Sequence, residues 1–337
     1  MSAERVPITL ITGFLGSGKT TLLNHILRAG TGERMVVIVN EFGDVGIDGS
    51  LVVGTSEELI EFQNGCICCT IRGDLQATVT ELVERRGRRF WKRLRFDRIL
   101  IEASGVATPG PVIQTFLVDP DLAAITRVDG VIALAHALHI PDQLETHPEA
   151  AAQLAYADRI VLNHTDRVDD AGLDAARATI RGANPLAPVW TAEQGDVDPL
   201  DLLRVGTTDA SRWSFDAGSA ADIETAVAAL EPANHTQGIT TLTLRTTERL
   251  DYHRLRMWLQ FVAARRTWEM IRLKGIVRCK DHGPLTIVHG VYQWVELKPA
   301  AGEIPDESVL VFIGRDLDHE ELTRGWRLVT GEEEAVL

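Results

Sequence analysis

The chain has 337 residues, 45% of them hydrophobic and 24% charged, and a formal net charge of −14 at neutral pH. These proportions are ordinary for a globular protein, and the length suits one large and one small domain. The negative charge argues against nonspecific binding to nucleic acid or to an anionic membrane. Because we recognise no signal peptide and no apolar run long enough to span a bilayer, we expect a cytoplasmic protein.

The first predicted elements are a strand and a helix joined by a glycine-rich segment. Residues 8–12 are apolar or β-branched, as in a buried strand, and residues 21–27 have the apolar spacing of a helix. Between them, residues 13–20 match G-x-x-x-x-G-K-[ST] without a mismatch. Strand, glycine loop and helix form the context that a phosphate-binding loop (P-loop) requires.

The residues of this loop have separate expected roles. The glycines permit backbone angles that bring N–H groups around phosphate oxygens, and the helix N-terminus adds partial positive charge. We expect Lys19 to reach the β- and γ-phosphates and Thr20 to bind Mg²⁺ through its hydroxyl. The predicted nucleotide-binding residues here are Gly13, Gly16, Ser17, Gly18, Lys19, Thr20 and Thr21.

A second buried strand is predicted at residues 36–39, and an acidic segment with glycines follows it. Glu41, Asp44 and Asp48 therefore come after a strand, where ligands bind in open α/β sheets. Their carboxylates could serve Mg²⁺, the attacking water or a second metal, and the sequence does not separate these roles. For Asp44 and Asp48 a solvated acidic loop is an equal alternative.

Three of the four cysteines, Cys66, Cys68 and Cys69, lie within four residues. Thiolates are good ligands for zinc, Cu(I) and cobalt-like ions, whereas a reducing compartment makes a disulfide framework unexpected. Three thiolates leave a tetrahedral site one ligand short, as a transfer site requires. Buried thiols that pack as small hydrophobes and a redox switch are the alternatives. Cys279 is far away and is expected to be a lone core or surface thiol.

A third strand, predicted at residues 98–102, ends in Glu102. An acid at the end of an apolar strand is the second standard element of a phosphate site, where it orders Mg²⁺ and its waters. In the segment that follows, Gly105 could offer its backbone N–H to the γ-phosphate and so report hydrolysis.

The predicted strand at residues 158–162 leads into Asn163, His164, Thr165 and Asp166. This segment is similar to the N-K-x-D sequence with which GTPases read guanine. A carboxylate at Asp166 matches the two donors of guanine, whereas adenine presents an acceptor at N1, so guanine is favoured. His164 replaces the lysine, and an imidazole can still stack on a purine. Residues 191–192, after a predicted strand, are expected to form a second base-contacting loop.

Taken together, these segments resemble the CobW/YjiA-type metal-chaperone P-loop GTPases, relatives of the HypB and UreG maturation proteins. The resemblance implies a doubly wound, mostly parallel α/β P-loop sheet with a smaller C-terminal α+β domain. It implies hydrolysis of GTP with Mg²⁺, for which Lys19 and Glu102 are the catalytic candidates. It also implies nucleotide-dependent binding of Zn²⁺ or Co²⁺ and delivery of that metal to a client protein. The candidate ligands of this metal are Cys66, Cys68, Cys69 and Glu41.

We divide the chain into a GTPase domain (1–205), a linker (206–237) and a C-terminal domain (238–330). In the last of these we predict a strand at 239–246 and a helix at 252–264, then strands at 275–279, 285–288, 292–297 and 309–313. The histidine-rich linker of some family members is missing, which argues against nickel storage.

Two other classes of function remain open from the sequence. One is an ATP-dependent small-molecule kinase or ATPase with a structural cysteine–metal site, and the guanine-type segment disfavours it. The other is a passive metal buffer, which the complete P-loop disfavours. The sequence names neither the metal nor the client, and self-association as a homodimer is left open.

Overall fold

The computed structural model describes residues 5–29, 31–40, 59–62, 72–87, 95–203, 239–266, 269–280, 285–299 and 306–332. The chain divides into two compact units, Met1–Thr179 with Ala187–Gly206, and Ile180–Leu186 with Thr207–Leu337. The predicted linker lies outside the described residues, as do the candidate ligands Glu41, Asp44, Asp48, Cys66, Cys68 and Cys69.

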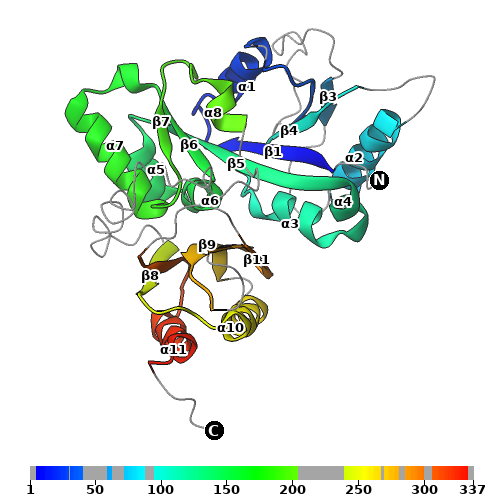
Figure 1. Ribbon diagram of the computed structural model, residues 1–337. Helices are drawn as coiled ribbons and strands as arrows, with labels where there is room; N and C mark the ends of the chain where they lie inside the picture. Colours follow the sequence, from blue (N-terminus) through cyan, green and yellow to red (C-terminus); the bar gives the residue numbers. More distant parts are fainter. Residues whose placement is uncertain are drawn as a thin grey trace. The chain divides into compact units, whose positions relative to one another are not determined.

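The first unit is built on a parallel sheet, seven strands wide in the described part of the chain (Figure 1). The spatial order is β3-β2-β4-β1-β5-β6-β7, and every neighbouring pair runs parallel. Because the chain extends from β1 to both sides, the predicted doubly wound fold is confirmed. The strands are β1 (Val6–Gly13), β2 (Met35–Asn40), β3 (Leu59–Phe62), β4 (Arg98–Glu102), β5 (Thr126–His136), β6 (Arg159–Asn163) and β7 (Val189–Thr191).

Helices cover both faces of this sheet. In Figure 1, α1 and α8 lie over one face, and α3, α4 and α6 lie over the other. On the α1 side, Leu22 and Leu23 pack with Leu100 and Ile132 of the strands in a core that excludes water. The helical segments are α1 (Lys19–Arg28), α2 (Arg72–Gly87), α3 (Gly110–Val118), α4 (Pro120–Ile125), α5 (Ile140–Thr146), α6 (Pro148–Tyr156), the short 3₁₀ turn η1 (Thr165–Arg167), α7 (Asp170–Ala183) and α8 (Pro199–Leu203).

The central strand β5 was not among the sequence predictions. It lies between β1 and β6, and all of its residues after Asp129 except the last are buried. The charged residues Arg127 and Asp129 break the apolar run at its start. A strand with a buried carboxylate is unexpected from local pattern alone, since such a charge needs partners from elsewhere in the chain.

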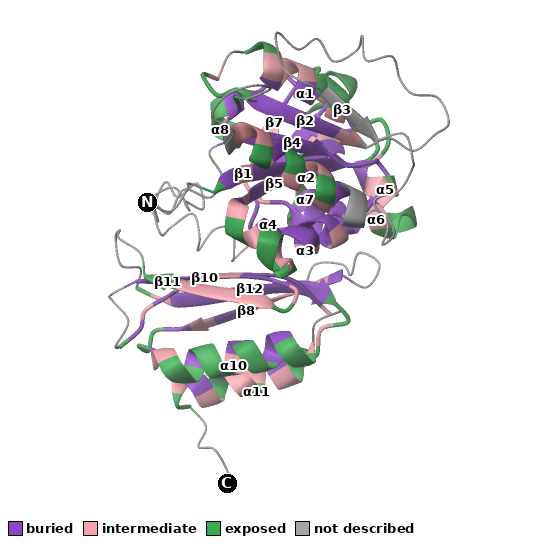
Figure 2. Ribbon diagram, turned by 90° about the vertical axis from the view of Figure 1, so that its right-hand side faces the viewer, coloured by how far each residue is buried: buried purple, intermediate pink, exposed green. Residues whose placement is uncertain are grey.

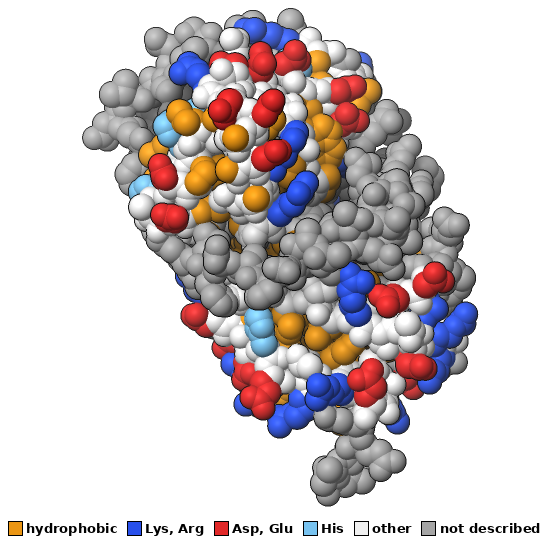
Figure 3. Space-filling model, turned by 90° about the vertical axis from the view of Figure 1, so that its left-hand side faces the viewer, with side chains coloured by type: hydrophobic (Ala, Val, Ile, Leu, Met, Phe, Trp, Pro, Cys, Tyr) orange, Lys and Arg blue, Asp and Glu red, His pale blue; other side chains and the backbone are white. Residues whose placement is uncertain are grey.

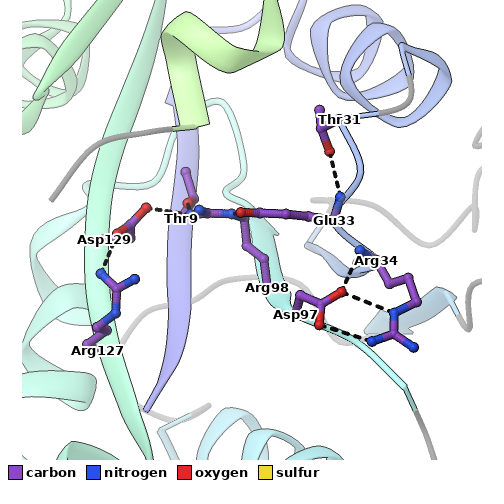
Figure 4. Close-up of polar contacts among 8 residues, drawn as sticks. All are labelled: Thr9, Thr31, Glu33, Arg34, Asp97, Arg98, Arg127 and Asp129. Carbon is purple, nitrogen blue, oxygen red and sulfur yellow. Dashed lines mark hydrogen bonds and ion pairs between the residues drawn. The ribbon is translucent and has the colours of Figure 1, made fainter. Parts of the chain in front are cut away.

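Those partners form a buried ion network across three strands, at the end of β4 opposite Glu102 (Figure 4). Arg98 donates from Nε to Glu33 Oε2 (2.7 Å) and from Nη1 to Thr9 Oγ1 (2.8 Å) and Asp129 Oδ2 (2.5 Å). Arg127 Nη1 donates to the other oxygen of Asp129 (2.6 Å). Burial raises the pKa of Asp129, and the charges of the two arginines offset part of that rise. The network fastens β1, β4 and β5 together.

The second unit is an antiparallel sheet in the order β11-β10-β9-β12-β8, with two helices along one face (Figure 2). Its core includes Leu273, Phe312, Trp326 and Cys279, the last of which is buried. The predicted α+β domain is thus confirmed. Its elements are β8 (Ile239–Thr246), α10 (Tyr252–Arg265), β9 (Met270–Val277), β10 (Thr286–Val291), β11 (Trp294–Pro299), β12 (Ser308–Arg315) and α11 (His319–Thr330).

Two strand predictions in this unit were displaced, and α11 was not predicted. β9 begins five residues before the predicted start at residue 275, because Arg272 and Lys274 are strand residues despite their charge. β11 begins at Trp294, since Tyr292 has a left-handed backbone (φ 53°) in the turn after β10. Local patterns give a strand's existence more reliably than its ends.

Both acidic and basic side chains lie among the described residues on the face drawn in Figure 3. Among the helices of the described ranges, none is both long and apolar enough to cross a bilayer.

Candidate functional site

Four central strands end at one edge of the parallel sheet, and their last residues carry polar groups or begin the glycine loop. β1 ends at Gly13, β4 at Glu102, β5 at His136 and β6 at Asn163. The strand register places Ile11 beside Glu102 and His136 beside Asn163. Segments up to 150 residues apart in the sequence are therefore brought together where ligands bind in open α/β folds.

The glycine loop leads into α1 as the sequence predicts. Gly18 caps the helix in a left-handed conformation (φ 99°), with no side-chain cap and no acidic residue in the first turn. The N-cap residue thus offers no carboxylate or hydroxyl of its own to the amide groups of this helix end, as suits an anion site. Lys19 Nζ donates to the carbonyl oxygens of Gly13 (2.9 Å) and Phe14 (3.3 Å), so the loop wraps around its own ammonium group.

The predicted Mg²⁺ residues are in direct contact. Thr20 Oγ1 donates to Glu102 Oε1 at 2.8 Å, although the two residues lie 82 positions apart. Glu102 is only 5% exposed. A hydroxyl and a carboxylate are hard oxygen ligands, so this pair fits a magnesium ion.

The loop after β4 is fixed against the P-loop. Gln153 of α6, which is buried, donates through Nε2 to the carbonyl oxygens of Gly105 and Ala107, both at 3.0 Å. Gly105 packs so closely on Leu15 of the P-loop that a Cβ there would lie 2.7 Å from the Leu15 side chain. Sequence reasoning missed Gln153, and the available signal was one amide among the small apolar residues of α6. Gly105 is therefore well placed to respond to a group bound at the P-loop.

Asn163 joins three loops of the site. It is fully buried, its Nδ2 donates to the Ser17 carbonyl (2.9 Å), and its Oδ1 accepts from the Gly195 N–H (2.9 Å). A side chain at Gly18 would collide with the Asn163 amide, so the glycine is required at that position. The amide was predicted among the nucleotide-binding residues, and in the described structure both of its ends are engaged by backbone.

The other residues predicted to contact the base come directly after Asn163 in the sequence. Asp166 is exposed, and Arg167 Nε lies 3.4 Å from its Oδ2. Thr165 donates from its backbone N (3.3 Å) and its hydroxyl (3.1 Å) to the Ala192 carbonyl, so the predicted second loop adjoins the first. His164 has φ +61°, and its ring stacks on His136, a residue that sequence reasoning did not single out.

Within the described residues, no three His, Cys, Asp or Glu side chains are close enough to hold a metal ion together. The predicted transition-metal ligands all lie outside those residues. The neighbouring strand ends are nevertheless defined: β2 and β3 are paired and stop together at Asn40 and Phe62. These two strands therefore end at the same edge of the sheet as β1 and β4, which they adjoin through the β2–β4 pairing.

Comparison with known families gives two matches. Residues 7–191 match the family described as CobW/HypB/UreG, nucleotide-binding domain, and residues 239–329 match the cobalamin synthesis protein cobW C-terminal domain. Together these ranges contain the strands of both sheets except Val6, the first residue of β1.

Individual relatives agree. The chain is 40% identical over 198 residues to zinc chaperone YjiA of Escherichia coli, an alignment that covers 59% of this chain and 60% of that protein. It is 30% identical over 357 residues to zinc-regulated GTPase metalloprotein activator 1 of Schizosaccharomyces pombe, covering 96% and 83% of the two chains. The crystal structure of Zn(II)-bound YjiA GTPase from E. coli superposes with a TM-score of 0.70 at 27% identity, over 97% of this chain and 99% of that one.

Proposed function

Because the chain belongs to the CobW/HypB/UreG family, we propose that it is a GTP-hydrolysing metallochaperone that binds a transition metal in a nucleotide-dependent manner and delivers it to a client protein. One observation carries the proposal. The P-loop, the Thr20–Glu102 pair and the segment from Asn163 to Asp166 converge on one sheet edge.

The hydrolytic part rests on the P-loop and on β4. Lys19 holds the Gly13 and Phe14 carbonyls and would exchange them for phosphate oxygens when a nucleotide enters. Thr20 and Glu102 would hold Mg²⁺, which when bound neutralises charge on the β- and γ-phosphates. Gly105, fixed by Gln153 and packed on Leu15, would transmit the presence of the γ-phosphate to the loop after β4.

The proposed preference for guanine nucleotides rests on Asp166, and the variant Asp166→Ala tests it. Loss of two charge-assisted hydrogen bonds is expected to weaken GDP binding about 30-fold and to remove the preference over ADP. The measurement is competition of GDP and ADP against a fluorescent guanine nucleotide. Asp174→Ala, an exposed carboxylate on α7, is the matched control and should leave the affinity unchanged. A wild-type preference for ADP would overturn the GTPase assignment in favour of the kinase or ATPase class.

The metal part rests on the chemistry of Cys66, Cys68 and Cys69 with Glu41. Thiolates suit several soft ions, but the names of the YjiA and CobW relatives and the Zn(II)-bound relative support zinc over cobalt as the cargo. A nucleotide bound at the P-loop would alter the affinity of these ligands for the metal, and by linkage the metal would alter the affinity for the nucleotide to the same extent. A cytoplasmic location and a client metalloprotein belong to the same proposal.

A further inference from the structure

Three imidazole rings form a row beside the P-loop. His136 ends β5, His139 follows it in the chain, and His164 comes from the turn between β6 and η1. The rings of His136 and His164 are stacked, with centroids 4.3 Å apart and planes 19° apart. The ring of His139 lies on His136 at 4.4 Å, tilted by 44°. None of these contacts is required by the roles assigned so far.

The His164 ring is held at a defined place. Its backbone has φ +61°, a left-handed conformation that only a few per cent of non-glycine residues adopt, and the preceding Asn163 is anchored at both ends. Its Nε2 is buried with no hydrogen-bond partner among the described residues. The same atom would lie 3.7 Å from a Cβ placed at Gly18. A buried polar atom beside the P-loop is suited to a ligand that enters there.

His136 is suited to support that ring. Its Nδ1 accepts a hydrogen bond from the Leu138 N–H at 3.2 Å, so the proton of the neutral ring belongs on Nε2. Burial lowers the pKa of His136 to about 4, with further lowering by His164, His139 and Arg167 against a smaller opposite effect of Asp166. The ring is therefore uncharged near neutral pH, and it can lie flat against a second imidazole without charge repulsion.

We propose that His136 is a positioning residue for base recognition, whose ring holds the His164 imidazole as the platform for the base of a guanine nucleotide. This inference rests on the proposed GTPase function and deepens it. A lysine at position 164 would cover the base with a long aliphatic stem. An imidazole is shorter than a lysine side chain. The stacked His136 ring holds the His164 imidazole in place, a support that the lysine stem does not need.

The first test is GDP affinity, measured calorimetrically near neutral pH for His136→Ala and His136→Phe. His136→Ala removes the stacked ring and is expected to weaken GDP about tenfold. His136→Phe keeps a flat ring and is expected to stay within about twofold of wild type. His253→Ala, an exposed histidine on α10, is the matched control. The double variant His136→Ala/His164→Lys should recover the affinity, since the lysine stem needs no second ring.

The second readout is the pH profile. As the pH falls through about 4, the His136 ring gains a proton and a positive charge that its stacked position disfavours, so wild-type affinity should decline more steeply than that of His136→Phe. His164, His139, Arg167 and Asp166 face position 136 in both proteins, so the difference between the two profiles reports the proton taken up by His136. A merely structural role of the ring would leave the two profiles parallel.

The outcomes separate the two proposals. If wild type binds no guanine nucleotide, the proposed function fails. If wild type binds GDP and His136→Ala binds it equally well, the function stands and the positioning role is wrong. If His136→Ala does not fold, His136→Phe decides. GDP affinity that is retained, and that falls less than wild type at acidic pH, supports the positioning role. Lost affinity, or a pH profile parallel to that of wild type, overturns it.

Discussion

Lys19→Ala is expected to weaken GTP binding about 100-fold and to lower the hydrolysis rate about 1000-fold. The ammonium group lies inside the P-loop, within 3.3 Å of two of its carbonyl oxygens. With the lysine gone, the phosphates lose their charge-assisted partner and the loop loses the group around which it wraps. Binding is measured by calorimetry with a nonhydrolysable GTP analogue, and hydrolysis by phosphate release.

Two further variants test whether the effect is specific to the ammonium group of Lys19. Lys280→Ala, an exposed lysine of the second unit, should have no effect on either quantity. Lys19→Arg keeps the charge but replaces a compact ammonium by a planar fork, so it should recover binding only in part. Wild-type hydrolysis in Lys19→Ala would show that the P-loop is not the catalytic phosphate site.

Arg98→Met is expected to lower the free energy of unfolding by about 3–5 kcal/mol, because it removes the closest partner of a buried carboxylate. Arg98 is 4% exposed and donates to Asp129, Thr9 and Glu33 across β1, β4 and β5. Of the arginines that pair with Asp129 in the described part of the chain, Arg127 remains in the variant. Denaturant unfolding measures the loss, and the double variant Arg98→Met/Asp129→Leu should regain most of it, since no buried charge is left unpaired.

The same variant has a defined pH dependence. The folded-state pKa of Asp129 is already raised by burial, and loss of Arg98 raises it further. Between the unfolded and folded pKa values the native state binds more protons, so its stability falls as the pH rises through that window. The deficit of Arg98→Met should therefore shrink on acidification. The exposed Arg34–Asp97 pair, also drawn in Figure 4, is the matched control, and Arg34→Met should change stability little. If Arg98→Met lowered the free energy of unfolding as little as Arg34→Met, the stabilising role of the ion network would be contradicted.

The site residues that could be predicted from the sequence are those in short motifs next to a recognisable strand. The glycine loop, Glu102 and Asp166 each follow a strand that is readable from its apolar run, and parallel strands bring their carboxyl ends to one edge. This placement needs no knowledge of side-chain contacts. The contact of Thr20 with Glu102 follows from it directly.

The unpredicted parts depend on contacts between distant segments. The apolar run of β5 is interrupted by Asp129, whose buried carboxylate pairs with Arg98 of another strand as well as with Arg127 of its own. Gln153 fixes a loop 46 residues away, and His136 acquires its partner only through the register of β5 with β6. The local hydrophobic pattern of the sequence does not predict such pairings, because each depends on how distant segments pack in three dimensions.

The most direct test of nucleotide-controlled metal binding is a chelator-competition titration of Zn²⁺ on the reduced protein. It is run with Mg²⁺ and either a nonhydrolysable GTP analogue or GDP, with Cys66→Ser as the site variant and Cys279→Ser, the buried thiol of the second unit, as its matched control. The proposed coupling predicts at least about tenfold tighter zinc with the GTP analogue, about 1.4 kcal/mol, and loss of this response only in Cys66→Ser. The same zinc affinity in both nucleotide states would contradict it and leave a passive metal site beside a GTPase.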